Sequence, residues 1–301
     1  MRILITGATG FVGSTLVPYL YNNGIKNIAI IVRSKEKAER LFKSIPLKII
    51  LSDENMEKEI QSFNPDVVIH LAAFFTGKSD LEAAKELIDT NILFTTRLLI
   101  ALGNTSCKAF LNTGTFTEFV HGANVYQPSN LYSATKNAIR SIIRMFQLLQ
   151  GWKWINVIVY SPYGRLNTGS PKVIDHLINA MDSKDPIPFS GGEQKLDLIH
   201  VDDMADFYLH LINKLPSLND EFYEFHLGSG QAHSIREIAA LMQEVFGKKP
   251  NADWGKYPYR EKESMFTVAP ISKNISVLGW QSKISLKQGL EILKKSLENN
   301  G

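Results

Sequence analysis

Residues 2–13 read RILITGATGFVG, an apolar run that leads directly into three glycines, Gly7, Gly10 and Gly13. Glycine at these places permits a tight turn, an unobstructed approach of backbone to a pyrophosphate, and close packing of a helix on a strand. Phosphates held there lie at the N-terminus of the following helix. A simple strand-to-helix turn also explains such a triplet. Its position on the first strand of an alternating chain favours a dinucleotide cofactor.

Short apolar runs alternate with longer amphipathic segments through the first two thirds of the chain. This pattern is typical of a parallel sheet covered by helices on both faces. Strands are expected at 2–5, 27–32, 47–51, 66–71, 109–112 and 155–160, and helices near 11–22, 36–44, 54–62, 80–104 and 131–150. The predicted fold class is therefore α/β, a Rossmann-type doubly wound parallel sheet, with ligands at the carboxyl ends of its strands.

The regular alternation loosens after residue 165, where prolines and glycines indicate loops around one helix. A strand at 222–227 is expected to return to the sheet after a helix that starts near Asp202. Segments 234–246, 253–270 and 285–298 are predicted as helices plus extended loop. We expect a dinucleotide-binding domain at 1–165 plus about 200–228, and a smaller α/β substrate lobe at about 166–199 plus 229–301.

Composition excludes several classes of protein. The 301 residues carry 33 Lys and Arg against 30 Asp and Glu, a net charge of +3, which fits neither a nucleic-acid-binding arm nor an acidic tail. Apolar runs fall far short of the roughly 20 residues that a membrane span needs. The N-terminus enters a strand at once, without the pattern of a signal peptide, so a cytoplasmic protein is expected. Cys107 is the single cysteine, which excludes an intramolecular disulfide and a cysteine-based zinc site.

The second strand ends in Arg33-Ser34-Lys35, where a fold selective for NAD usually carries an acidic residue. A guanidinium there can hold a 2′-phosphate in bidentate fashion, and Lys35 can add a point charge. The sequence therefore favours NADP(H), with NAD(H) as the alternative. The opposing interpretation is a solvated basic helix start. Asp53, after the third strand, is expected near the adenine amino group.

Tyr132 and Lys136 lie four residues apart in a helical pattern and so share one face. A nearby ammonium favours the phenolate, which predicts a tyrosine pKa closer to neutrality than the usual value of about 10. Tyr132 can then protonate a carbonyl as hydride arrives, or act as base in the reverse direction. Taken alone, a tyrosine and a lysine four residues apart are also common on helix surfaces that have no catalytic role.

Together these motifs resemble the short-chain dehydrogenase/reductase superfamily, in its extended branch of nucleotide-sugar epimerases, dehydratases and reductases. The matching stretches are TGATGFVG at 6–13, DVVIHLAA at 66–73, Asn91, YSATK at 132–136 and GEQKLDLIHVDD at 192–203. The resemblance implies Thr115 as the third catalytic residue, with Thr113 as the fallback, hydrogen-bonded to the oxygen that Tyr132 protonates. It also implies that Lys136 holds the nicotinamide ribose.

The resemblance further implies which residues line the ligands. Cofactor contacts are expected from Gly7, Thr9, Gly10, Phe11, Val12, Gly13, Arg33, Ser34, Lys35, Asp53, Leu71, Ala72, Ala73, Asn91, Thr113, Tyr160 and Ser161. Substrate contacts are expected from Phe75, Thr117, Ser161, Lys195 and Arg260. Arg260 matches a phosphate-binding arginine of the family, against the alternative of a surface salt bridge with Glu261 or Glu263.

Two departures from the family pattern concern the substrate. Leu196 precedes Asp197 where many relatives have arginine, and Ser161 stands where many have asparagine. His70 is interpreted as a packing residue at a strand end. His200, Asp202 and Asp203 are interpreted as a helix N-cap and its flank rather than as metal ligands, and no metal is expected.

The same resemblance indicates which of the family's reactions, dehydration, reduction or epimerisation, the enzyme is expected to catalyse. Family dehydratases carry an Asp-Glu pair directly after the catalytic Ser or Thr, whereas this chain has Phe116 and Thr117. The stretches FLNTGTF at 110–116, GEQKLDLIHVDDMADFYL at 192–209, HLGSGQAHSIRE at 226–237 and residues 260–293 resemble the CDP-abequose synthase group. This resemblance implies NADPH-dependent reduction of the 4-keto group of a CDP- or TDP-linked 4-keto-6-deoxyhexose, for a surface polysaccharide such as lipopolysaccharide O-antigen or for a glycoside. The alternatives are a nucleotide-sugar 4-epimerase with retained NAD and a non-catalytic NADP-binding sensor.

Relatives commonly dimerise through the helix that carries Tyr and Lys and the long helix before it. A homodimer is expected here through 80–104 and 131–150, and exposed apolar positions at Leu98, Ile139, Ile142 and Met145 are compatible with that contact. Packing of the two helices in the protein's own core explains these positions equally well.

Overall fold

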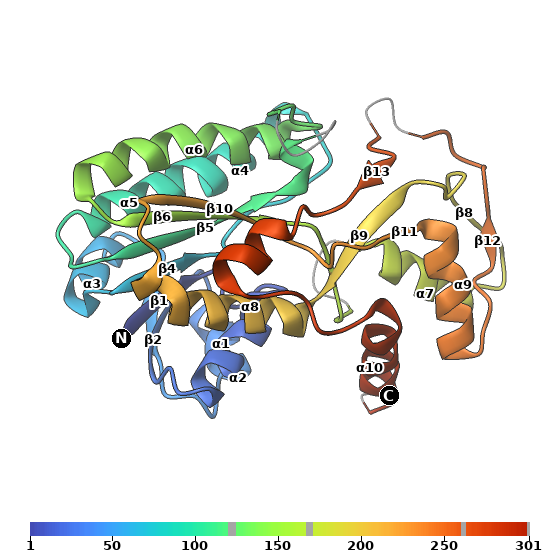
Figure 1. Ribbon diagram of the computed structural model, residues 1–301, viewed down its shortest axis with the longest axis horizontal. Coiled ribbons are helices and arrows are strands. Elements are labelled where there is room, and N and C mark those ends of the chain that lie inside the picture. The colour runs from blue at the N-terminus through green and yellow to red at the C-terminus, as the bar shows by residue number, and fades with distance from the viewer. Residues whose placement is uncertain (120–124, 167–170, 260–262, 300–301) are drawn as a thin grey trace.

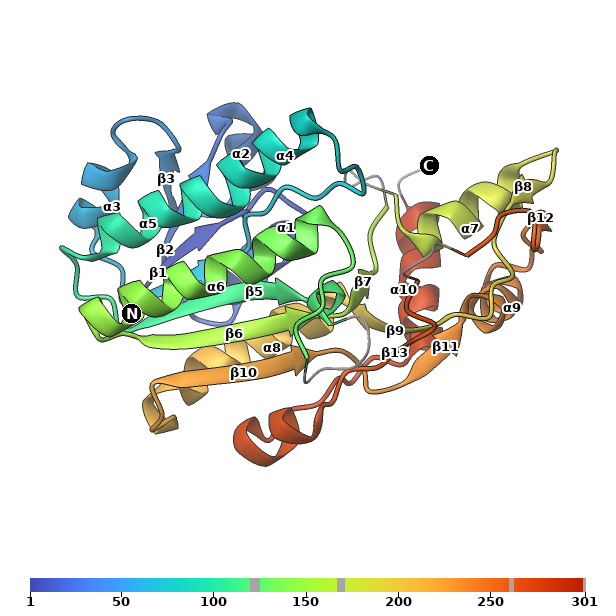
Figure 2. The same cartoon turned by 90° about the horizontal axis from the view of Figure 1, so that it is seen from above.

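The computed structural model describes residues 1–119, 125–166, 171–259 and 263–299. Within these residues, seven parallel strands form the central sheet (Figures 1 and 2). They are β1 (Arg2–Thr6), β2 (Asn27–Val32), β3 (Lys48–Leu51), β4 (Val67–His70), β5 (Ala109–Thr115), β6 (Lys153–Val159) and β10 (Phe222–Leu227), in the order β10-β6-β5-β4-β1-β2-β3. This strand order confirms the Rossmann-type α/β fold. It also confirms that 222–227 returns to the sheet, because β10 pairs with β6 along its whole length.

Helices cover both faces of the sheet (Figure 2). One face carries α1 (Gly13–Asn22), α2 (Lys35–Leu41) and α8 (Val201–Lys214), and the other carries α3 (Met56–Phe63), α4 (Leu81–Ile88), α5 (Thr95–Leu102) and α6 (Leu131–Gln150). Strand residues alternate between the two cores: Ile3 and Ile5 pack with α1 and α8, whereas Leu4 packs with α5 and α6. Burial on both faces explains why these strands read as continuous apolar runs.

The segment predicted as helical near 80–104 is helical throughout 81–102, with one irregular turn inside it. A π-helical turn, η1 (Asp89–Phe94), separates α4 from α5. Such turns carry an extra residue and occur frequently at functional sites. Here the turn contains Asn91, which is 2% exposed and points its amide at the loop after β4. The predicted helical segment is therefore confirmed, whereas its π-helical turn was not predicted, because periodicity alone does not register one added residue.

A second group of elements extends from the carboxyl end of the sheet (Figure 1). Its centre is β9 (Lys195–His200), which pairs with β7 (Ser161–Tyr163), β11 (Ala232–Ser234) and β13 (Phe266–Thr267). The other elements of this group are β8 (Ile187–Pro188), β12 (Ala252–Asp253), α7 (Val173–Asp182), α9 (Ile235–Phe246) and α10 (Leu286–Glu298). The short turns η2 (Phe116–Glu118), η3 (Leu215–Ser217) and η4 (Asn274–Leu278) contact α6 or α8 instead. The hydrophobic core of the second group is separate from the two cores of the sheet. This separate core includes Leu177, Leu198, Ile238 and Leu290.

One expectation for this region is corrected, because residues 195–200 form a strand rather than a loop. The expected mixture of helices and extended chain is confirmed, since α9 and α10 are helices and the described part of 253–270 is extended chain with short strands. The strand β9 was not predicted because one of its buried positions carries a carboxylate, Asp197, instead of the apolar residue that is typical of a buried strand. Asp197 accepts hydrogen bonds from the backbone N–H groups of Ser229 (2.7 Å), Gly230 (2.9 Å) and Ala269 (3.0 Å), and so ties three segments together.

Part of the dimer contact face that was expected on α5 and α6 lies in the core of the protein instead. Leu98 and Ile139 are buried in the core at 0% and 1% exposure, because these sides of their helices face the sheet. Met145 is 46% exposed and Ile142 is partly buried. Other exposed apolar side chains on this layer are Leu81, Ile88, Leu93, Ile100, Leu148 and Leu149. Among the residues described, no helix combines the length and apolar character that crossing a bilayer requires.

Candidate active site

The glycine loop joins β1 to α1, and the surrounding backbone leaves no room for side chains at Gly7 and Gly13. Gly7 has φ +69°, and a Cβ there would lie 2.6 Å from the backbone nitrogen of Ala72. A Cβ on Gly13 would clash with the carbonyl oxygen of Gly7 and lie 2.5 Å from the Cα of Ala8. Gly10 is exposed and donates its N–H to Gly7 O at 3.0 Å. Thr9, Phe11 and Val12 are partly exposed around it. This cradle of backbone at a helix N-terminus fits the pyrophosphate of a dinucleotide.

Two cations that the sequence analysis missed adjoin this loop. The Nζ of Lys172 lies 3.5 Å from the ring centroid of Phe11 and donates to Pro162 O at 3.0 Å. Burial lowers the pKa of Lys172 to about 8. Arg165 donates to Ser14 Oγ at 2.8 Å, on the first turn of α1. Both residues come from the irregular stretch after β7, where no periodicity indicates which side chains turn back toward the sheet.

The end of β2 places Arg33, Ser34 and Lys35 at the surface. Ser34 caps α2, since its Oγ accepts the N–H of Lys37 at 3.2 Å. Lys35 pairs with Glu39 at 3.7 Å. The 2′-phosphate hypothesis therefore depends chiefly on Arg33. Asp53, in the partly buried loop after β3, accepts the N–H of Asn55 at 2.8 Å.

The loop after β4 runs beside the glycine loop. Leu71 and Ala72 donate their N–H groups to Thr6, and Ala73 is exposed. Asn91 fixes the next residue, because its amide bonds both the N–H and the C=O of Phe74 and also donates to Thr135 on α6 at 3.0 Å. Both the oxygen and the nitrogen of the Asn91 amide are therefore hydrogen-bonded to protein groups, and these bonds fix the conformation of the loop after β4.

His70 is a packing residue, as predicted. Its two ring nitrogens bond Thr6 Oγ1 at 2.8 Å and Thr95 Oγ1 at 2.9 Å, and its ring stacks on Phe110. Burial lowers its pKa to about 3, so the imidazole is neutral. The structure likewise makes His200 the N-cap of α8, where its Nδ1 accepts the N–H of Asp202 at 3.3 Å. No cluster suited to a metal ion occurs in the described ranges.

Helix α6 carries Tyr132 and Lys136 on its first two turns. Asn130 caps it by accepting the N–H of Ser133 at 2.9 Å. Lys136 is 3% exposed, and burial lowers its pKa to about 8 against the opposing charge of Glu118. Burial, followed by the charge of Glu118, raises the pKa of Tyr132. The expectation that Lys136 would bring the phenol toward neutrality is therefore wrong for this arrangement.

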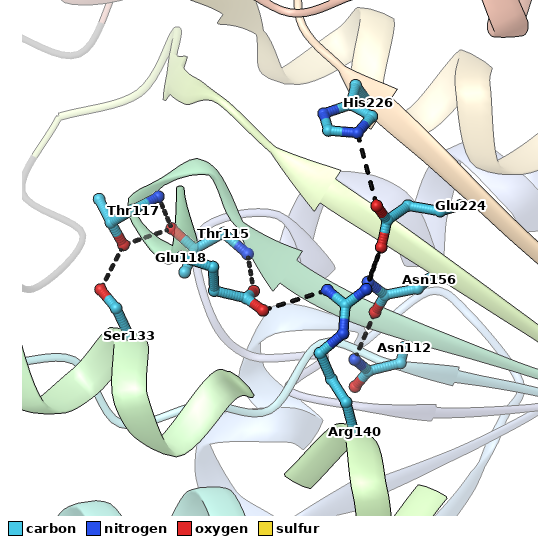
Figure 3. A network of polar contacts seen from close by, with 9 residues as sticks. All are labelled: Asn112, Thr115, Thr117, Glu118, Ser133, Arg140, Asn156, Glu224 and His226. Atoms are coloured by element: carbon cyan, nitrogen blue, oxygen red, sulfur yellow. Dashed lines mark hydrogen bonds and ion pairs between the residues drawn. The ribbon is translucent and has the colours of Figure 1, made fainter. Parts of the chain in front are cut away.

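Thr115 lies at the end of β5 and connects to α6 through hydroxyl groups (Figure 3). Its Oγ1 lies 3.0 Å from Thr117 Oγ1, which accepts a hydrogen bond from Ser133 Oγ at 2.7 Å. Ser133 is the neighbour of Tyr132 in the chain. On the other side, the ring of Phe75 meets that of Tyr132 edge-to-face at 5.0 Å. The structure thus gathers Thr115, Thr117, Tyr132 and Phe75 at the carboxyl edge of the sheet.

Other predicted site residues lie apart from this cluster. Thr113 Oγ1 bonds the hydroxyl of Tyr208 on α8 at 3.0 Å, so its hydroxyl faces the core. Tyr160 is 5% exposed, with its ring stacked on Phe116 and its hydroxyl 3.3 Å from His226 Nδ1. Its side chain is therefore enclosed by protein. Ser161 begins β7 and Lys195 is exposed on β9. Arg260 lies outside the described residues.

One buried residue beside the site was missed, namely Glu118. It bonds the backbone of Thr115 and pairs with Arg140 of α6. Part of this signal is present in the sequence, since Thr115 and Glu118 have the spacing of a capping box. Arg140 follows Lys136 by one helical turn. Only the folded structure shows that the charges of both side chains act on the carboxylate of Glu118.

Comparisons with known proteins agree with this geometry. The sequence pattern of the NAD dependent epimerase/dehydratase family matches residues 3–223. The chain belongs to this family and is an enzyme of the extended short-chain dehydrogenase/reductase type, which confirms the resemblance and supports a nicotinamide dinucleotide cofactor.

Individual relatives span nearly the whole chain. A CDP-abequose synthase of Yersinia pseudotuberculosis is 29% identical over 279 residues, covering 88% of this chain and 91% of the relative. A CDP-abequose synthase of Salmonella typhimurium is 26% identical, covering 98% of each. The solved UDP-glucuronic acid 4-epimerase of Bacillus cereus, in complex with UDP-glucuronic acid and NAD, has a TM-score of 0.87 at 21% identity, with each chain fully covered. That likeness establishes the fold.

The glycine geometry leads to a first prediction. Gly13→Ala inserts a methyl group 2.5 Å from the Cα of Ala8, so α1 must move away from β1. We expect a loss of about 3 kcal/mol or more in the free energy of unfolding, measured in urea, and a loss of dinucleotide binding measured by calorimetry. Gly77→Ala is the matched control, because a Cβ there meets nothing within 4 Å, and we expect a change of under about 0.5 kcal/mol. Equal stability of the two variants would show that close packing at Gly13 is not required.

Proposed function

We propose that this enzyme uses NADPH to reduce the 4-keto group of a CDP- or TDP-linked 4-keto-6-deoxyhexose, in the synthesis of a surface polysaccharide or glycoside. The observation that carries the proposal is the chain of hydroxyls from Thr115 through Thr117 to Ser133, which joins the end of β5 to the residue next to Tyr132 on α6. The similarity to CDP-abequose synthases over most of the chain supports the substrate class.

The proton chemistry favours reduction. A bound nicotinamide supplies the hydride, and the chain supplies the proton and the stabilisation of charge. Tyr132 donates its phenolic proton to the carbonyl oxygen, and Thr115 donates a hydrogen bond to the same oxygen, where negative charge develops. Because the pKa of Tyr132 is raised, the phenol stays protonated near neutrality, which is the form that an acid needs. Lys136, with a pKa of about 8, is mostly an ammonium at neutral pH, and its proposed role is to hold the nicotinamide ribose.

The surroundings of Thr115 count against dehydration. The family's Asp-Glu pair is replaced by Phe116, which stacks on Tyr160, and by Thr117, which belongs to the hydroxyl chain. Glu118, the carboxylate nearest in sequence, is fully buried and turned toward Arg140 (Figure 3). It is thus not placed to replace the missing pair.

The proposed ligand contacts divide along the chain. Residues 1–165 with about 200–228 are proposed to hold the dinucleotide, and about 166–199 with 229–301 to hold the nucleotide sugar. Arg33 supports NADPH over NADH, since its guanidinium is exposed where a 2′-phosphate is expected. Phe75, Thr117, Ser161, Lys195 and Arg260 remain the proposed substrate contacts.

A homodimer forms part of the same proposal. Leu148 and Leu149 at the end of α6 are exposed, as are Leu93 on η1 and Ile100 on α5. The helices α5 and α6 belong to the same layer (Figure 2). An apolar surface of this kind marks an interaction site. A second copy packing its own α5 and α6 there would bury these side chains.

A nucleotide-sugar 4-epimerase is the second candidate. The observation in its favour is the likeness of the whole chain to the Bacillus cereus 4-epimerase. An epimerase must first remove a proton from a sugar hydroxyl, which needs the phenolate form of Tyr132. The raised pKa of Tyr132 opposes that step.

The proposed reaction is tested by the loss of NADPH absorbance with CDP- and TDP-4-keto-6-deoxyglucose. We expect turnover with one of them, and a fall in kcat of about 100-fold or more in Tyr132→Phe, because the proton donor is lost. Tyr21→Phe is the control, since Tyr21 lies on α1 away from the site and should keep normal kcat. A Tyr132→Phe enzyme with more than a tenth of normal kcat would contradict the assigned acid.

The cofactor preference is tested separately with Arg33→Ala. Loss of a charge-assisted contact to the 2′-phosphate should raise the KM for NADPH about tenfold or more, and leave the KM for NADH nearly unchanged. Arg40→Ala removes an exposed arginine of α2 and should alter neither KM. Equal effects of Arg33→Ala on both cofactors would refute the 2′-phosphate contact.

A further inference from the structure

A buried carboxylate lies directly beneath the proposed catalytic threonine (Figure 3). Glu118 is the last residue of η2 and has no exposed surface. Its Oε1 accepts the backbone N–H of Thr115 at 2.8 Å, and its Oε2 lies 3.1 Å from Nη1 of Arg140. Gly114 makes room for this contact, because a Cβ there would be 2.8 Å from Glu118 Oε1. The backbone at the end of β5 is therefore fixed by a carboxylate.

Arg140 connects this carboxylate to a second one. Its other nitrogen pairs with Glu224 on β10, which also accepts Nδ2–H of Asn156 at 2.9 Å. His226 Nε2 lies 3.6 Å from Glu224 Oε1, and the ring of Tyr126 lies 4.4 Å from the Arg140 guanidinium. Arg140 is 7% exposed. One buried guanidinium thus joins β5, β10 and the helix that carries Tyr132.

The charges in this network do not balance within it. Two glutamates face one arginine, and Lys136 lies one turn before Arg140 on α6. The negative charge of Glu118 raises the pKa of Lys136 against the effect of burial, and also contributes to the raised pKa of Tyr132. Burial raises the pKa of Glu118, and the charges of Arg140 and Lys136 oppose that rise by favouring its ionised form. Glu118 is therefore the member of the network that acts on both titrating groups of the site.

A purely structural role is a poor explanation for such a network. Holding charges in a protein interior costs desolvation free energy, and well-packed apolar residues join a helix to a sheet at least as well. We propose that Glu118 is a positioning residue for the reaction: it holds the Thr115 backbone at the end of β5 and keeps Lys136 charged, without touching the substrate. The inference rests on the proposed function, because it concerns the same site.

The first test replaces the charge and keeps the shape. In Glu118→Gln the negative charge is lost, so the pKa values of Lys136 and Tyr132 should both fall, and the alkaline limb of the kcat profile should move to lower pH by about half a unit or more. Glu224→Gln is the matched control, because it removes the carboxylate on the other side of Arg140. We expect its alkaline limb to stay at the wild-type position.

A second readout needs no turnover. In protein with 13C-labelled lysine, the Cε resonance of Lys136, assigned with Lys136→Met, reports its titration directly. The same downward shift is expected in Glu118→Gln and not in Glu224→Gln. If neither variant shifts, or both shift alike, Glu118 has only a structural role. If Lys136 shifts as expected but no keto sugar is reduced, the proposed function fails, whereas the electrostatic part of this inference stands.

Replacing each glutamate by aspartate tests the contact between Glu118 and Thr115. These variants also test the positioning role of Glu118 if Glu118→Gln does not fold. Glu118→Asp keeps the charge but withdraws it by one methylene from the Thr115 N–H. We expect kcat to fall about fivefold or more with little change in KM, because Thr115 is misplaced toward the developing oxyanion. Glu224→Asp makes the same change on the far side of Arg140 and should reduce kcat less than about twofold. Equal losses in the two aspartate variants would overturn the positioning role.

Discussion

The close approach of α1 to the end of β1 governs the rest of this structure. Gly7 and Gly13 leave no room for a Cβ, and Gly7 also packs against the backbone that follows β4. The glycine loop, β4 and the first turn of α1 are consequently held as one unit at the centre of the sheet edge. This is the switch point of a doubly wound sheet, where ligands bind. Every proposed contact with the dinucleotide depends on that packing.

The second determinant is the control of charge at the neighbouring strand end. Thr115, Thr117 and Ser133 form a chain of hydroxyls from β5 to α6, while Glu118 and Arg140 lie buried behind it. Burial lowers the pKa of Lys136 and raises that of Tyr132, which keeps the phenol as an acid and the lysine near its titration point. Positioned groups of this kind, matched to one direction of proton transfer, suit the reduction of a ketone.

Local pattern predicted most of the sheet and part of the site. The glycine loop, the six alternating strands and the Tyr132–Lys136 spacing are features of neighbouring residues, so the sequence alone indicates them. The strand β9 escaped prediction because its buried Asp197 is satisfied by backbone groups from residues far away in the chain. For Leu98 and Ile139 the sequence left a dimer contact and the protein's own core as alternatives, since periodicity shows that a helix has an apolar face but not what that face covers. The structure places both in the core. The Glu118–Arg140–Glu224 network joins residues up to 84 apart along the chain, and no local pattern reports such a contact.

The central claim is net transfer of hydride to carbon 4 of a nucleotide-linked keto sugar. It is tested most directly with NADPH that carries deuterium at the transferable position of the nicotinamide, with CDP- and TDP-4-keto-6-deoxyglucose as substrates and mass spectrometry of the product. The account predicts one deuterium at carbon 4 of each product molecule and one NADPH consumed for each. Conversion of a hydroxy sugar into its 4-epimer, with no label incorporated and no NADPH consumed, would contradict it.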